Sequence, residues 1–142
     1  MKEIYLLVCL IIGSYYDVRY MSIPKCYFYL CGIFTTLLII FDRSNTLMDI
    51  IIGVIFGLIL LILAKFTKES IGYADGLITL FIGLLFGGTV SIVIFMLASF
   101  LTGIFGIIVS IFKKTSLKMR LPLFPGILIS YSIWMIIRGC GI

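Results

Sequence analysis

The sequence predicts an all-helical membrane protein, a polytopic bundle of six transmembrane helices, on three observations. Of its 142 residues, 63% are hydrophobic and 12% are charged, whereas soluble domains average about 25% charged residues. The apolar residues gather in six segments, and the basic residues alternate in number between the polar stretches that separate them. Because a chain this short and apolar cannot cover a soluble globule with polar groups, residues 1–142 are expected to form a single integral-membrane domain.

The six apolar segments are expected to be the helices. They cover roughly Ile4–Tyr16, Cys26–Phe41, Leu47–Ala64, Leu77–Gly88, Thr89–Phe112 and Leu123–Ile137. A helix needs about 20 residues to cross the hydrocarbon core, and several segments are shorter. The first and fourth reach that length if helix continues through the flanking polar residues, which would place Asp17 and Asp75 in helical ends. The pair Gly87-Gly88 separates the fourth and fifth segments, and one long bent helix is the alternative there.

Lysine and arginine predict the orientation of the bundle. Eight lie on one side (Arg19, Lys25, Lys65, Lys68, Lys113, Lys114, Lys118 and Arg120) and three on the other (Lys2, Arg43 and Arg138). The positive-inside rule places the eight in the cytoplasm and both termini outside. Asp17 and Asp75 then share the cytoplasmic face, whereas Asp42 and Asp49 lie on the outer face.

Composition also excludes several classes of chemistry. The chain has no histidine, which excludes a histidine triad, a histidine metal site and a histidine general base. Its four cysteines, Cys9, Cys26, Cys31 and Cys140, form no C-x-x-C pair, so they are expected to pack as small apolar residues rather than bind zinc. The net charge of +5 follows from topology, and neither a nucleic-acid partner nor a cofactor or metal is expected.

Two aspartates at one membrane boundary suggest a dyad that shares a proton. Neighbouring carboxylates cannot both ionise cheaply, so one holds a proton while the other is charged. The charged member can take a proton from water, and the protonated member can hydrogen-bond a scissile carbonyl. Asp75 as a helix N-cap, and both acids in a small transporter or proton-conducting protein, are the alternatives.

Three short stretches carry a resemblance to a known family: D-V-R-Y-M-S-I-P-K at 17–25, G-Y-A-D-G-L at 72–77 and L-P-L-F-P-G at 121–126. In this order they resemble the first aspartate signature, the Gly-x-Gly-Asp signature and the Pro-Phe-Gly-Pro segment of the type IV prepilin peptidases. Lys25 replaces an asparagine of the first signature, and Ala74 replaces the second glycine of the second. The resemblance covers nearly the whole chain.

The resemblance implies an aspartic endopeptidase with Asp17 and Asp75 as its catalytic residues. Arg19, Pro24, Gly72, Pro122 and Pro125 would support them. The family removes the short basic leader of prepilins and pseudopilins at the cytoplasmic boundary of the prokaryotic plasma membrane. The larger members' N-terminal domain is missing here, so a peptidase-only enzyme is expected.

The neighbours of the aspartates have expected roles of their own. Gly72 is expected to let the chain turn sharply beside Asp75, and Pro24 to start the second helix at Lys25. Arg19 is expected to anchor lipid phosphate or to lower the pKa of Asp17. Because Ala74 excludes a conformation that glycine alone tolerates, a catalytically impaired accessory subunit is a further alternative.

Overall fold

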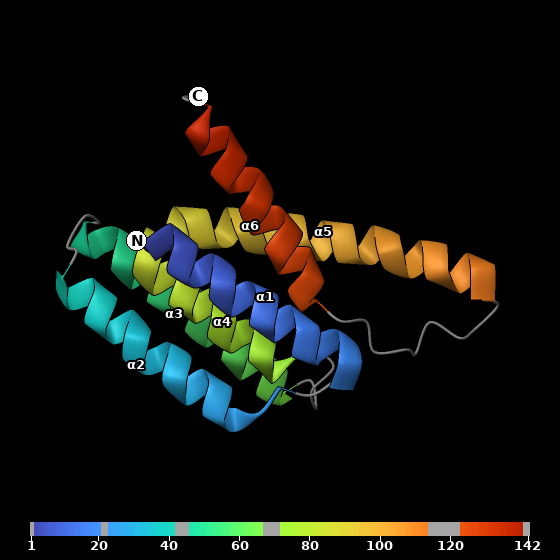
Figure 1. The fold of residues 1–142 in the computed structure, drawn as a ribbon, viewed down its shortest axis with the longest axis horizontal. Coiled ribbons are helices and arrows are strands. Elements are labelled where there is room, and N and C mark those ends of the chain that lie inside the picture. The colour runs from blue at the N-terminus through green and yellow to red at the C-terminus, as the bar shows by residue number, and fades with distance from the viewer. Residues whose placement is uncertain (1, 21–22, 42–45, 67–71, 114–122, 141–142) are drawn as a thin grey trace.

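The computed structural model describes residues 2–20, 23–41, 46–66, 72–113 and 123–140, and within these ranges the chain is helical, with no strand. The elements are α1 (Lys2–Tyr20), α2 (Lys25–Phe41), α3 (Leu47–Phe66), α4 (Tyr73–Phe86), α5 (Gly88–Lys113) and α6 (Phe124–Gly139) (Figure 1). The prediction of an all-helical protein with six helices is therefore confirmed. Asp17 and Asp75 lie inside helical ends, as the short first and fourth segments required.

The glycine pair breaks the chain between α4 and α5. Gly87 has a φ of 93°, in the left-handed region that side chains rarely adopt, and its N–H donates to the carbonyl oxygen of Gly83 at 3.0 Å. This is the geometry of a glycine that ends a helix. The alternative of one long bent helix is therefore wrong.

Two helices of the described ranges are long and apolar enough to cross a membrane, at Leu47–Phe66 and Gly88–Val109. Helices α2, α4 and α6 are apolar but shorter, with 17, 14 and 16 residues. Many large apolar side chains point outward, among them Phe41, Phe66 and Ile111, which are 85%, 81% and 70% exposed. Apolar exposure on this scale is typical of a surface that faces lipid or another apolar partner.

Helix α4 is the centre of the bundle. It packs against α2, α3 and α5, while α1 packs against α6. Ile78, Ile82 and Leu85 of α4 are fully buried in one core with Leu10 of α1 and Ile127 of α6. Figure 1 shows α5 extending past the other helices at its C-terminal end.

Glycines bring α3 and α4 into backbone contact. A Cβ atom added to Gly53 would lie 2.7 Å from the Cα of Gly83, and one added to Gly57 would lie 2.7 Å from the Cα of Leu80. Small residues four apart on one helix allow this approach, as in helix pairs within membranes. The crossing therefore determines how α4 is placed, and with it Asp75.

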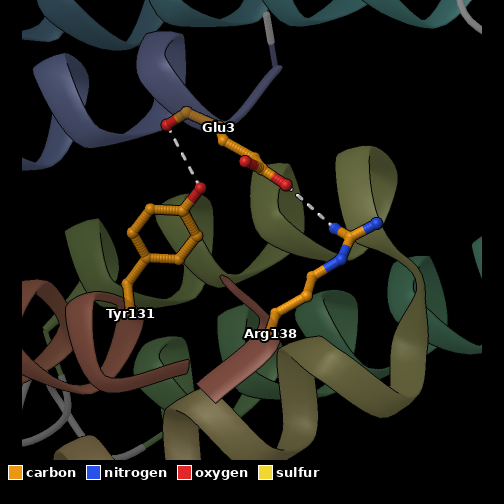
Figure 2. A network of polar contacts seen from close by, with 3 residues as sticks. All are labelled: Glu3, Tyr131 and Arg138. Carbon is orange, nitrogen blue, oxygen red and sulfur yellow. Dashed lines mark hydrogen bonds and ion pairs between the residues drawn. The ribbon is translucent and has the colours of Figure 1, made fainter. Parts of the chain in front are cut away.

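Helices α1 and α6 run antiparallel and are joined at the end far from Asp17. The hydroxyl of Tyr131 donates to the main-chain oxygen of Glu3 at 3.1 Å, and the guanidinium of Arg138 pairs with the Glu3 carboxylate at 3.0 Å (Figure 2). Both charged groups are exposed enough that solvent screens the ion pair, so the apolar contact of the two helices contributes more.

We predict that Gly53→Ala destabilises the protein, because its methyl group would meet the backbone of Gly83. Forced overpacking of this kind costs about 1–3 kcal/mol. Gly103→Ala is the control, since nothing lies within 4 Å of a Cβ atom there. The measurement is thermal unfolding in detergent, and equal Tm values for the two variants would contradict a close α3–α4 crossing.

Candidate active site

Asp17 lies in the last turn of α1, against the first turn of α6. Its Oδ2 atom accepts a hydrogen bond from the main-chain N–H of Phe124 at 3.3 Å. The C-terminal end of α1 is unfavourable for a negative charge, but the N-terminal end of α6 is favourable for one. Helix α6 thus supplies the stabilisation that α1 cannot.

Asp75 is the third residue of α4 and is 8% exposed. Its carboxylate folds back to the N–H of Gly72, the N-cap residue of the helix. This is half of a capping box, in which the third side chain satisfies the N-cap donor. The alternative that Asp75 is itself the N-cap is wrong, since Gly72 holds that position.

The charge of Asp17 acts on the carboxyl group of Asp75. Both lie outside the apolar segments Ile4–Tyr16 and Leu77–Gly88. Burial raises the pKa of Asp75, the charge of Asp17 raises it further, and the Gly72 hydrogen bond partly opposes both. Burial also raises the pKa of Asp17, against the lowering effect of the Phe124 N–H. Of the two carboxyl groups, that of Asp75, the more deeply buried, therefore holds a proton more readily.

The lack of a side chain at Gly72 provides space rather than a special backbone conformation. Its backbone is extended, with φ −61° and ψ 125°, which any residue can adopt. The expected glycine-only turn is therefore absent. A Cβ atom at this position would instead overlap Oδ2 of Asp75. The absence of a side chain at residue 72 makes room for the carboxylate.

Arg19 points away from Asp17. Two residues along a helix are separated by about 200°, so the two side chains leave opposite faces of α1. The guanidinium lies 5.8 Å and 5.7 Å from the ring centroids of Tyr15 and Tyr20. Lowering of the Asp17 pKa by Arg19 is thus not supported, and lipid anchoring stays a prediction.

The three prolines of the motifs have different outcomes. Pro24 directly precedes α2, which begins at Lys25 as predicted, and its carbonyl accepts the N–H of Tyr27 at 3.0 Å. Pro125 is the second residue of α6, where its missing N–H costs no helical hydrogen bond. Pro122 lies outside the described residues.

Sequence reasoning missed Gly13 and Phe124. Gly13 is buried one turn before Asp17, and a Cβ atom added to it would lie 2.5 Å from Cε1 of Phe124. Phe124 is itself 0% exposed and carries the N–H that binds Asp17. The signal in the sequence was the spacing of four between Gly13 and Asp17, which places both on one face of α1.

Other polar contacts do not involve the carboxyl groups of Asp17 and Asp75. Cys9 and Cys31 are buried between α1 and α2 with their Sγ atoms 3.5 Å apart. The hydroxyl of Thr79 donates to the main-chain oxygen of Asp75 at 2.6 Å, and Ser91 donates to that of Thr79 at 2.9 Å. Among the described residues, no three Cys, Asp or Glu side chains lie together where they could hold a metal ion.

Comparison with known proteins identifies the family of this chain. The model of the type IV leader peptidase family matches residues 4–107, nearly three quarters of the chain, and this range includes both aspartates. No curated protein and no solved structure matches the chain. The chain belongs to the type IV leader peptidase family, whose members are peptidases, and its apolar helices are consistent with a membrane location.

Proposed function

We propose that this peptidase removes the short basic leader of prepilins or pseudopilins, with Asp17 and Asp75 as its catalytic dyad. The observation that carries the proposal is the placement of these aspartates. The end of α1 and the starts of α4 and α6 lie together (Figure 1), and the charge of Asp17 acts on Asp75. The residues to either side of the dyad resemble the family's signatures in order, with Lys25 and Ala74 as departures.

The different environments of Asp17 and Asp75 indicate the chemical role of each aspartate. Asp17 accepts the N–H of Phe124 and faces a helix N-terminus, which favours the carboxylate. It takes a proton from water while the water oxygen attacks the scissile carbonyl carbon, and it returns that proton to the leaving amine nitrogen when the C–N bond of the tetrahedral intermediate breaks. Asp75 is buried and close to a like charge, so it keeps its proton and donates a hydrogen bond to the carbonyl oxygen. No cofactor or metal takes part.

The proposed setting is the plasma membrane of a prokaryote, with six crossings, both termini outside and the dyad at the cytoplasmic boundary. The lysine and arginine distribution supports this orientation. Asp49 lies beside Gly87, at the end of α4 opposite Asp75, which agrees with its expected outer position. The partners are the bilayer and prepilin-like substrates.

A proton-conducting role is supported less well. The buried hydroxyls of Thr79, one turn after Asp75, and of Ser91 both donate to main-chain carbonyl oxygens. A carbonyl oxygen has no proton to pass on, so these contacts form no relay. Membership of a peptidase family also favours hydrolysis.

We predict that Asp17→Asn and Asp75→Asn each lower leader cleavage by about 10²- to 10⁴-fold, because an amide cannot exchange the proton. Asp49→Asn is the matched control and should cleave normally. The measurement is co-expression with a prepilin from the same genome, scored by the gel shift of the leader. Full activity in either dyad variant would refute the aspartic mechanism.

Gly72→Ala is predicted to lower cleavage by about 10²-fold while the protein stays folded. Alanine can adopt the backbone angles of residue 72, but its methyl group displaces the Asp75 carboxylate, and small displacements of a reacting group are costly. Gly103→Ala is the control. Normal cleavage by Gly72→Ala would show that the carboxylate does not need this space.

Topology is tested separately with reporter fusions. Fusions after residues 43 and 88 should report the external side, and those after 68 and 116 the cytoplasm, because the basic loops are retained inside. Opposite sides for 68 and 116 would refute the six-crossing arrangement.

A further inference from the structure

We propose that Gly13 and the main chain of Phe124 form a positioning unit that holds Asp17 as the charged, water-activating member of the dyad. The inference deepens the proposed function and rests on it. Neither residue takes part in the reaction. Their effect passes through Asp17 alone.

The contact between α1 and α6 connects the two residues to Asp17. Gly13 and Asp17 are four residues apart, so they share one face of α1. The ring of Phe124 packs on that face at Gly13 and is fully buried, while the N–H of the same residue reaches Oδ2 of Asp17 at 3.3 Å. The ring and the donor therefore belong to one residue, which contacts the same face of α1 at two points.

No side chain fits at residue 13. A Cβ atom there would lie 2.5 Å and 2.8 Å from Cε1 and Cδ1 of Phe124, and 3.0 Å from the hydroxyl oxygen of Tyr27. Contacts this short force a neighbour to move. Tyr27 closes the other side, since its hydroxyl donates to the main-chain oxygen of Cys9. The Phe124 ring must then move, and because this ring is fully buried, the first turn of α6 moves with it and carries the donor away from Asp17.

Few other described groups influence Asp17. From α4, Asp75 faces it with a carboxyl group, and from α2 the Tyr27 hydroxyl lies one turn away beside Gly13. Arg19, on the same helix, points to the opposite face. The first turn of α6, residues 124–127, has no ionisable side chain. The Phe124 N–H is thus the group that lowers the pKa of Asp17 against the effect of burial.

The consequence is a specific change in pH dependence. Because the N–H stabilises the charged form, losing it raises the pKa of Asp17. Cleavage requires this carboxylate to be charged, so the acidic limb of the pH–rate profile moves to higher pH. The basic limb reports loss of the proton on the partner carboxyl and should move less. Because the two carboxyl groups interact, each limb reports an apparent pKa of the pair and not of one residue.

The experiment compares Gly13→Ala, Phe124→Val, the double variant and Gly32→Ala in the full-length protein. Gly32 is the matched control: it also faces a phenyl ring, that of Phe81, but at 3.6 Å, which leaves room for a methyl group. Leader cleavage is measured from acidic to basic pH, with kcat and KM separated, and folding is checked by thermal unfolding.

We expect Gly13→Ala to move the acidic limb up by about one pH unit, which is about tenfold less activity below the limb, with KM unchanged. Phe124→Val keeps the N–H but loses the ring that places it, so its limb also moves. In the double variant, the methyl group added at residue 13 fills part of the space left by the ring, and the shift is smaller than in either single variant. Gly32→Ala keeps the wild-type profile.

Three outcomes would overturn the inference. They are an unmoved acidic limb in Gly13→Ala, a uniform loss of activity at every pH, and a double variant whose shift is the sum of the single shifts. If Gly13→Ala fails to fold, an unmoved limb in Phe124→Val overturns it. Any of these results together with an inactive Asp17→Asn leaves the proposed function standing, whereas an active Asp17→Asn removes the proposed function itself.

Discussion

The burial of the Asp75 carboxyl group within reach of the charge of Asp17, which is itself half-buried, is the constraint on which the rest of this structure depends. An isolated buried charge is costly, and a like charge nearby adds to the cost. Each aspartate therefore faces the N-terminal end of a helix. Asp75 uses its own helix, α4, through the N–H of Gly72, and Asp17 uses α6 through the N–H of Phe124. Alternate helices of an up-and-down bundle bring these ends to the same side.

Close packing between helices determines the positions of the two aspartates. Gly53 and Gly83 let α3 and α4 meet at their backbones, and Gly13 lets the first turn of α6 press against α1. Neither contact leaves room for a methyl group, so the position of each aspartate follows from the neighbouring helix. At the end far from Asp17, helices α1 and α6 are joined by an exposed ion pair between Glu3 and Arg138. The relative position of the two helices needs to be less precise there.

The helices could be predicted because lipid and core both select long apolar runs. The two aspartates of the proposed dyad could be singled out because they lie in stretches that resemble the family's signatures. The hydrogen bond from the Phe124 N–H could not be predicted, because a main-chain donor does not depend on the type of the residue. Gly13 was one of 14 glycines, and its role depends on the rotation of α1 against α6. The rotation of α1 against α2 also brings the Sγ atoms of Cys9 and Cys31 to 3.5 Å from each other. The two separate apolar segments of the sequence do not indicate this contact.

At residue 74 this chain has alanine where the Gly-x-Gly-Asp signature has its second glycine. The geometry at the start of α4 explains why alanine fits there. Ala74 is the second residue of α4, in right-handed helix, where alanine is the most favourable residue and a glycine-only conformation has no use. The N-cap and third positions of a helix are the partners of a capping box, so the glycine that must accommodate the carboxylate lies three residues before it, at Gly72. That glycine is retained. The conformational argument for an impaired subunit therefore loses its basis, because the methyl group of Ala74 lies on a helix rather than in a strained loop.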